Sequence, residues 1–465
     1  MIEAFAKAHS KCRVVVTSRT YAYQSKEGRL PGFAVAELAP FDNGQIRRFV
    51  ELWYADAASR KALKSAVAPE RVASLLRAVF GHPHILELAR RPLLLTLMAS
   101  LHAFKGKDLP ERREQLYAET VELLLYRWEK QQRRLEKGKG ERWEPSLSDW
   151  LETSRSEIRR VLEQLAFEVH KGQPELSGTA DVPEGVLAAR LMKLSKEPEK
   201  KPEQNPARLL EYLRDRAGIL VPRGVEVYSF PHRSFQEYLA ACWLSSRGDY
   251  PDELARLVRE EPERWREVAL LAGATASATT PGPLWELVDA LCRKGPGESG
   301  ASSSDQWGAQ IGGQALAERG NREEIPDRHQ AKHARVVSWL VSTLEGSALP
   351  ARERALAGRS LSVLGDPRES VTKLDSMEFC WVPSGKFWMG SGKDDREAGS
   401  NERADHDLDL SYGYWMGRYP VTVSQWREYL ALSGVEPGGP DSLGGPPNAP
   451  VVRGSWHGAL GFCRW

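Results

Sequence analysis

The hydrophobic positions between residues 70 and 290 recur with the period of an amphipathic α-helix. In ERREQLYAETVELLLYRWEK (111–130) the apolar side chains at i, i+4, i+7, i+8 and i+11 share one face: Tyr117, Val121, Leu124, Leu125 and Trp128. In VLEQLAFEVH the same face carries Leu162, Leu165, Ala166 and Val169. Both stripes predict helices packed against a core. The charged stretches QQRRLEKGKGER and SKEPEKKPEQNP predict solvated loops.

A different pattern occupies the start of the chain. In KCRVVVTSRTYAYQ the β-branched run Val14, Val15 and Val16 predicts a buried parallel strand, and Arg19 follows at its carboxyl end. Ligands bind at that end of open α/β sheets, although an arginine in an ordinary surface loop fits the same pattern. Residues 33–49 predict a second short strand and then the start of a helix.

A helix, two short strands and another helix are predicted from LLEYLRDRAGILVPRGVEVYSFPHRSFQEYLAACWL, with a turn at Pro222 to Gly224. This order is typical of a winged-helix module. In the last helix one face carries Phe235, Leu239, Cys242 and Trp243, which predicts core positions. His232 lies just before this helix, where free N–H groups and an imidazole donor favour an anion. A capping or packing role for His232 remains the alternative.

Shorter helices follow between residues 246 and 371. WREVALLAGATASA and ARERALAGRSLSVLGDPRESV predict helix pairs, and Ala357, Leu361 and Leu364 share a face. With LGDPR as the turn, the segment resembles HEAT-like repeats, and a plain helical spacer is the alternative. From about residue 372 the chain is rich in glycine and aromatic residues, and strand-like alternation is found at Phe387 and Met389, and at Tyr412, Tyr414 and Met416.

Length, charge and cysteine content indicate which classes of protein and partner to expect. The 465 residues correspond to about three domains, and 65 Lys and Arg against 63 Asp and Glu leave a formal charge of +2. We therefore expect no nucleic-acid partner. Five widely spaced cysteines, at 12, 242, 292, 380 and 463, fit free thiols in a reducing compartment. Because no apolar run reaches membrane-span or signal-peptide length, we expect a soluble cytoplasmic protein without a membrane partner.

Three motifs in order resemble the second half of a NACHT-type signalling NTPase of the STAND class. They are VVVTSR, ARRPLLLTLMASLHAFKGKDLPERREQLYAETVELLLYRW and GILVPRGVEVYSFPHRSFQEYLAACWL. The resemblance implies nucleotide-binding roles. Arg19 would sense the terminal phosphate, Pro92 would pack near the adenine, and His232 would contact the β-phosphate of ADP. A proline at the first position of a helix is the alternative for Pro92.

The sequence departs from this family at the phosphate-binding loop. No G-x-x-x-x-G-K-[ST] motif is present, nor is an apolar strand that ends in acidic residues for Mg²⁺. The Gly/Ser-rich GPGESGASSSD (295–305) follows no strand and predicts a linker. We therefore expect a chain truncated at its N-terminus that does not hydrolyse ATP. ATP or ADP is expected for the complete parent protein, and no cofactor is assigned to this chain.

The last segment resembles the opening of a formylglycine-generating-enzyme domain, the sulfatase-modifying-factor family with a C-type-lectin-like core. VPSGKFWMGS, YPVTVSQWREYL and APVVRGSWHGALGFCRW carry the resemblance, which stops in mid-domain. Active members use a copper-binding cysteine pair, and Cys380 and Cys463 are not that pair. Residues His406, His457, Asp405 and Asp407 match no closed metal site, so neither a metal site nor a catalytic residue is assigned.

Together these patterns predict a multidomain, mainly α chain. The predicted parts are a remnant of the α/β NTPase sheet (1–68), a helical domain (69–150), a winged-helix domain (151–245), a HEAT-like helical linker (246–371) and an incomplete α+β lectin-like domain (372–465). The preferred hypothesis is a fragment of a bacterial signalling or defence NTPase whose C-terminal domain recognises a protein or ligand. Its parent is a candidate homo-oligomer. The alternative is the regulatory part of an oxidase of the formylglycine-generating family.

Overall fold

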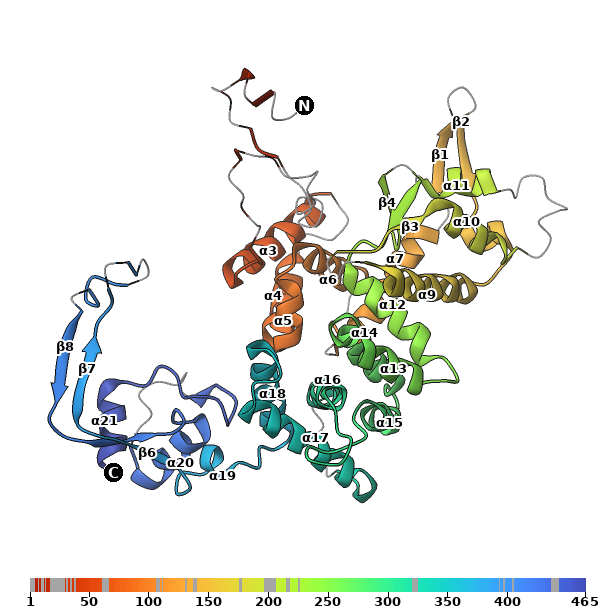
Figure 1. Ribbon diagram of the computed structural model, residues 1–465. Helices are drawn as coiled ribbons and strands as arrows, with labels where there is room; N and C mark the ends of the chain where they lie inside the picture. The colour runs from red at the N-terminus through yellow and green to blue at the C-terminus, as the bar shows by residue number, and fades with distance from the viewer. Residues whose placement is uncertain are drawn as a thin grey trace. The chain divides into compact units, whose positions relative to one another are not determined.

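The chain forms two units, each built around its own packed helices (Figure 1). They are Met1–Leu254 with Glu263–Thr279, and Ala255–Pro262 with Thr280–Trp465. The computed structural model describes residues 5, 6, 8, 9, 12, 14–16, 30, 32, 33, 36, 39–60, 67–105, 109, 110, 112–129, 132–136, 140–174, 178–195, 206–214, 218–224, 226–319, 325–392, 394, 395, 398–403, 405–435 and 443–465.

A group of helices forms the first core of the first unit: α3 (Asn43–Ser59), α4 (Ala68–Gly81), α5 (Pro83–Ala89), α6 (Pro92–Lys105) and α7 (Arg113–Glu129). Helix α3 begins with a capping box, because Asp42 Oδ1 accepts from the Gln45 amide at 2.7 Å and Gln45 Oε1 accepts from the Asp42 amide at 2.9 Å. In the core, the Tyr54 hydroxyl forms a hydrogen bond with His102 Nδ1, with 2.5 Å between the two atoms. The stripe predicted for α7 is confirmed at four buried positions: Tyr117, Val121, Leu124 and Leu125.

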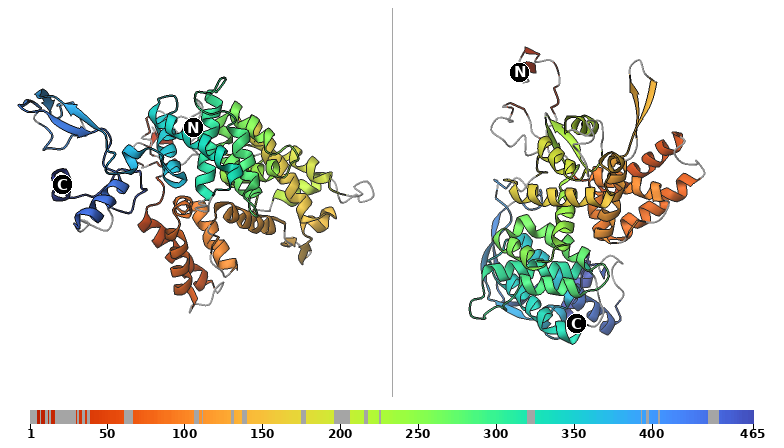
Figure 2. Two further views of the ribbon diagram at one scale, coloured as in Figure 1. Left: turned by 90° about the horizontal axis from the view of Figure 1, so that it is seen from below. Right: turned by 90° about the vertical axis from the view of Figure 1, so that its right-hand side faces the viewer.

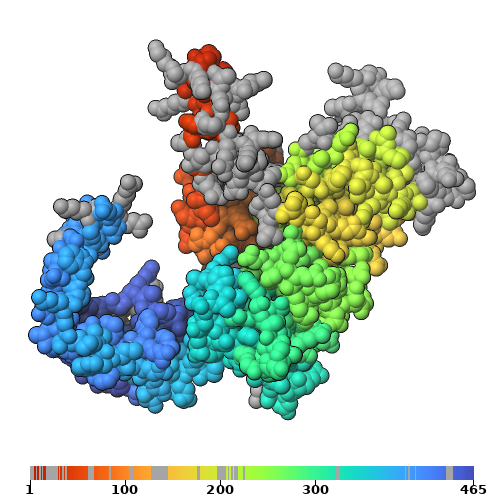
Figure 3. Space-filling view, viewed as in Figure 1, coloured from red at the N-terminus to blue at the C-terminus, as the bar shows by residue number. Residues whose placement is uncertain are grey.

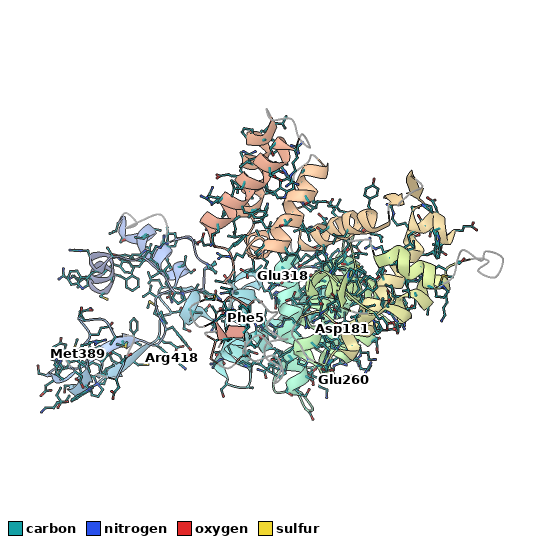
Figure 4. The ribbon with its side chains drawn as sticks, turned by 90° about the horizontal axis from the view of Figure 1, so that it is seen from above. Phe5, Asp181, Glu260, Glu318, Met389 and Arg418 are labelled. Atoms are coloured by element: carbon teal, nitrogen blue, oxygen red, sulfur yellow. The ribbon has the colours of Figure 1, made fainter. Side chains whose placement is uncertain are left out.

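The rest of the first unit contains short strands and two long helices that pack together, α9 and α12 (Figure 1). Its elements are β1 (Gln132–Glu136), β2 (Gly140–Glu144), α8 (Leu147–Leu151), α9 (Arg155–Gly172), β3 (Val182–Pro183), α10 (Glu184–Met192), α11 (Pro206–Arg214), β4 (Val221–Gly224), β5 (Val227–Ser229) and α12 (Arg233–Ser245). Strands β3, β5 and β4 form an antiparallel sheet in that order. Beside it, Arg223 Nη1 donates to Oδ1 of Asp181, labelled in Figure 4, at 2.6 Å.

Further helices follow: α13 (Asp252–Glu260), α14 (Pro262–Ala276), α15 (Gly282–Leu291), α16 (Ser303–Arg319), α17 (Asp327–Glu345) and α18 (Ala351–Leu364). Nearly all of α14 belongs to the first unit. In the second unit α16 packs against α15, α17 and α18 (Figure 2). Helices α15 and α16 approach closely at Gly308, where a Cβ atom would lie 2.0 Å from the Leu291 carbonyl oxygen. Ala357 and Leu361 are fully buried, as their shared face predicts.

The last part of the second unit combines two small sheets with helices. Its elements are α19 (Glu369–Thr372), β6 (Phe379–Val382), β7 (Gly385–Met389), β8 (His406–Leu410), β9 (Tyr414–Gly417), α20 (Val423–Ser433) and α21 (Trp456–Arg464). Strand β6 pairs with β9, and β7 pairs with β8, both antiparallel. Hairpin β7–β8 forms a thin arm (Figure 3), and every residue of β7, up to Met389 at its end (labelled in Figure 4), is exposed. A small core forms around Trp426, Tyr429 and Phe462.

The prediction of a buried strand at Val14, Val15 and Val16 is wrong. These residues form no strand, and Val15 is 87% exposed. A buried parallel strand needs neighbours that pair with it on both edges. Among the strands of the described residues all pairs are antiparallel, and none involves this segment. In 33–49 the predicted helix begins at Asn43, whereas described residues 33, 36 and 39–42 form no strand.

Two loop assignments also change. The segment 131–142, predicted as a solvated loop, contains β1 and part of β2, which pair from Gln132 with Glu144 to Glu136 with Gly140. Pro222 to Gly224, predicted as the turn, belongs to β4, and the chain reverses after it, where Glu226 has a φ of 59°. In the part of the chain that the structure describes, no helix has the length and apolar character needed to cross a membrane.

Candidate functional site

His232 occupies the N-cap of α12, directly after the short connection from β5. Its backbone is extended, and its ring Nδ1 accepts the amide proton of Ser234 at 3.1 Å. The Ser234 hydroxyl lies 2.9 Å from the same nitrogen. Because Nδ1 acts as an acceptor toward the amide, the neutral ring carries its proton on Nε2. The imidazole therefore caps the helix through one nitrogen and presents an N–H donor on the other.

The surroundings of His232 keep the ring neutral. Burial, and to a lesser extent the positive charge of Arg91, lower the pKa of His232 to about 4. The ring therefore stays uncharged at neutral pH, and Arg91 supplies the positive charge nearby. A neutral donor beside a guanidinium at a helix N-terminus suits a bound anion.

Arg91 and Pro92 come from the other side of this site, at the junction of α5 and α6. Pro92 is the first residue of α6 and is exposed, and Thr96 Oγ1 donates to its carbonyl at 2.8 Å. The structure thus brings the α6 N-terminus, through Arg91, within electrostatic reach of His232, 141 positions later in the chain. Arg19, the third residue predicted to bind nucleotide, lies outside the described residues. The adenine contact of Pro92 stays a prediction.

Arg91 was missed by the sequence analysis, although a signal was present. It is the second arginine of ARRPLLL and directly precedes the proline singled out there. Its side chain is exposed at the start of an otherwise apolar helix. An exposed cation fixed next to a helix N-terminus is unfavourable with respect to the helix dipole, and this would have marked the position for inspection.

Charged side chains around Glu237, in the first turns of α12, form ion pairs. Arg233 Nε pairs with Glu237 Oε1 at 2.6 Å, and Arg113 of α7 pairs with Glu267 of α14 at 3.1 Å. Burial raises the pKa of Glu237 to about 7, although the Arg233 charge and hydrogen bond oppose this. Burial also raises the pKa of Tyr117, whose ring stacks on Tyr238 with centroids 5.8 Å apart. Glu237 itself is only 8% exposed, and with this raised pKa it can take up or release a proton near neutral pH.

The Gly/Ser-rich segment 295–305 offers no comparable anion site. It runs into the first turn of α16, and the Asp305 carboxylate there accepts from the amides of Ser302 at 3.2 Å and Arg293 at 3.3 Å. A negative side chain therefore occupies this helix start. A phosphate would meet a like charge there.

The C-terminal segment shows exposed aromatic side chains. Trp381 and Trp415 lie opposite each other on β6 and β9, with ring centroids 5.2 Å apart, and are 53% and 65% exposed. Cys380 and Cys463 are exposed free thiols. His406 and Asp407 lie on β8. Within the described residues, no group of three or more His, Cys, Asp or Glu side chains is placed to hold a metal.

Two parts of the chain match known protein families. Residues 113–244 match the winged helix-turn-helix domain that lies C-terminal to NACHT. Residues 366–465 match the sulfatase-modifying factor enzyme 1-like domain. A search among curated proteins found no match to the chain. The first match includes His232 and α12 up to Leu244, and the second includes all of the strands from β6 to β9.

Proposed function

We propose that this chain, which joins a NACHT-associated winged helix to a sulfatase-modifying-factor-like domain, is part of a signalling or defence NTPase of the STAND class. In this proposal ADP, bound in the complete parent protein, contacts His232 and holds a closed state. Exchange for ATP removes this contact and shifts the population toward an active, oligomeric state. The helices of segment 246–371 other than α14 serve as a HEAT-like connection, and the C-terminal domain recognises a protein or another ligand.

The single observation that carries this proposal is the state of His232. Its Nδ1 is used by the Ser234 amide, so the Nε2–H donor has a fixed direction. Because the pKa of His232 is about 4, the ring is neutral at physiological pH, and the positive charge near it comes from Arg91. A diphosphate needs this combination of donors and positive charge. Because the Nε2–H donor belongs to the N-cap residue of α12, a phosphate that accepts from it would connect the winged helix to the nucleotide.

The test separates capping from phosphate contact. Asparagine is also a good N-cap residue, so His232→Asn keeps the cap but removes the Nε2–H donor. Amide hydrogen exchange of the complete parent protein, in which ADP is proposed to bind, is measured with and without millimolar ADP. We expect ADP to slow exchange at the start of α12 in the wild type, and His232→Asn or Arg91→Ala to weaken apparent affinity roughly tenfold to a hundredfold.

Arg90→Ala is the matched control, because Arg90 is the neighbouring arginine and its ion pair with Glu87 is long, with 3.9 Å between Nε and Oε2. This variant should respond to ADP as the wild type does. The proposal is wrong if ADP leaves exchange at α12 unchanged in the wild type, or if all of these variants respond equally.

The alternative function is regulation of an oxidase, and the match of residues 366–465 favours it. In that case the C-terminal domain would oxidise a substrate thiol. The complete parent protein is incubated with copper, oxygen and cysteine-containing peptides, and aldehyde formation is followed by hydrazide labelling. Aldehyde formed above the copper-only background would favour the oxidase, and its absence would favour recognition as the role of this domain.

A further inference from the structure

Helix α14 is held on the winged helix by a reciprocal pair of side-chain contacts. The guanidinium of Arg264 donates through Nη1 to the carbonyl oxygens of His170, at 3.1 Å, and Gln173, at 2.6 Å. In return, His170 Nε2 donates to the carbonyl oxygen of Arg264 at 3.2 Å. Each side chain thus binds the backbone of the other helix, and Arg264 also satisfies carbonyls at the C-terminal end of α9.

Gln236 of α12 closes the same network. Its amide nitrogen donates to His170 Nδ1 at 3.1 Å and to Gln173 Oε1 at 3.2 Å, and its oxygen accepts the Ala180 amide at 2.8 Å. These contacts use the whole hydrogen-bonding capacity of the amide nitrogen. We call the set His170, Gln173, Gln236 and Arg264 the α14 clasp.

The α14 clasp is closed to water. His170 and Gln236 have no exposed surface, and Arg264 and Gln173 are each 8% exposed. Burial lowers the pKa of His170 to about 4, which keeps the ring in the neutral form that the contacts require. Around it, Trp265 packs on His170 and Phe167 with ring centroids 5.0 Å and 5.8 Å apart. Opening any one of these contacts would leave a buried polar group without its hydrogen-bond partner, which lowers the free energy of unfolding.

We infer that α14 is an integral part of the winged-helix module and moves with α9 and α12 as one body, although the family match ends at residue 244. The pair between Arg113 and Glu267 adds a second tie, from α7 to α14. The chain enters α14 from residues 255–262 and leaves it toward residue 280, and both segments belong to the second unit. If His232 senses nucleotide, as the proposed function holds, α14 therefore moves together with α12 when the bound nucleotide changes.

The inference is tested without nucleotide, by amide hydrogen exchange of the full chain. We expect the most protected amides of α9, α12 and α14 to share one opening free energy in the wild type, because a single cooperative unit opens as a whole. If α14 exchanges through an easier opening than α9 and α12, the inference is wrong. Since no ADP is present, a failure of nucleotide binding would refute the proposed function and leave this result standing.

A substitution then identifies the clasp as the cause. Arg264→Lys keeps the positive charge, but an ammonium group lacks the planar fork of guanidinium. We expect exchange to become roughly tenfold faster in α9, α12 and α14 together, as for the loss of one buried hydrogen bond. Arg256→Lys, at an exposed pair with Glu260, is the control and should change nothing. Acceleration confined to α14 would overturn the inference, and the wild-type measurement decides it even if the variant does not fold.

Discussion

His232 and His170 show how one residue type acquires two roles from its neighbours. Both rings have a pKa lowered to about 4 by burial, and both use Nδ1 as an acceptor, for the Ser234 amide and the Gln236 side chain respectively. They differ in what Nε2 meets. In His170 it donates to the Arg264 carbonyl inside the protein. In His232 the cap uses Nδ1, and Arg91 supplies a positive charge that acts on the ring, so of the two rings His232 is the one suited to an external anion.

Glu237 should make stability depend on pH near neutrality. Burial raises its pKa from 4.5 to about 7, so its stabilising contribution is complete below pH 4.5 and is lost as the pH rises through 7. Relative to Glu237→Gln, which keeps a side-chain acceptor for Arg233, the wild type should lose on the order of 3 kcal/mol of unfolding free energy between pH 4.5 and pH 7.

Urea unfolding of both proteins at several pH values measures this difference. His170 and His232 act with the opposite sign, because their lowered pKa values remove stability as the pH falls from 6.5 toward 4. Both proteins contain these histidines, so their effect cancels in the comparison. A difference between the two proteins that does not vary with pH would show that Glu237 ionises normally.

The elements that the sequence predicted well are helices whose apolar residues recur along one face. The stripes of α7, α9 and α12 follow the 3.6-residue period, and most of their predicted residues are buried. Hairpin β1–β2 was missed because QRRLE and GERWE show no apolar alternation. Strand β3 is two residues long, too short for any period. Val14 to Val16 show the reverse error, since β-branched residues favour a strand only where partner strands are available.

The candidate site was predictable in part for the same reason. The position of His232 follows from the strand and helix on either side of it in the sequence. The electrostatic effect of Arg91 on His232 links residues 141 positions apart, which no local pattern encodes. The α14 clasp joins Arg264 to His170 across 94 positions. Contacts of this separation arise from tertiary packing, so they appear only in the structure.

The close approach of α15 and α16 gives a prediction for one glycine. A Cβ at Gly308 would lie 2.0 Å from the Leu291 carbonyl oxygen, so Gly308→Ala must push the two backbones apart. We expect the free energy of unfolding to fall by about 2 kcal/mol or more. At Gly312 the nearest atom to a Cβ is Val288 Cγ2 at 3.5 Å, an ordinary contact.

Gly312→Ala is therefore the matched control on the same helix. Alanine favours helix over glycine by about 1 kcal/mol, so this variant should be as stable as the wild type or more so. Thermal or urea unfolding followed by circular dichroism measures both. Equal effects of the two substitutions would contradict the close backbone contact at Gly308.

At the scale of the whole chain, the second unit connects its helices to its C-terminal part through buried polar contacts. Asn448 Nδ2 donates to Asp366 Oδ2 at 2.7 Å and to the Gly358 carbonyl of α18 at 3.1 Å. Gln425 and Thr422 of the α20 start bind the carbonyls of Ser370 and Val371 at 2.9 Å and 2.8 Å. Residues 366–374 are therefore a structured joint, which agrees with a family match that begins at residue 366.

Removal of Asn448 should loosen this joint. Burial alone would raise the pKa of Asp366, but hydrogen bonds from Arg368 and Asn448 lower it, so the carboxylate stays ionised inside the joint. In Asn448→Ala the Asp366 carboxylate loses one donor and the Gly358 carbonyl loses its side-chain donor. We expect trypsin to cleave after Arg368 and Lys373 roughly tenfold faster than in the wild type, because local opening becomes easier by about one hydrogen bond. Asn401→Ala, in an exposed loop, should leave these cleavage rates unchanged, and equal rates in all three proteins would show that the joint does not depend on Asn448.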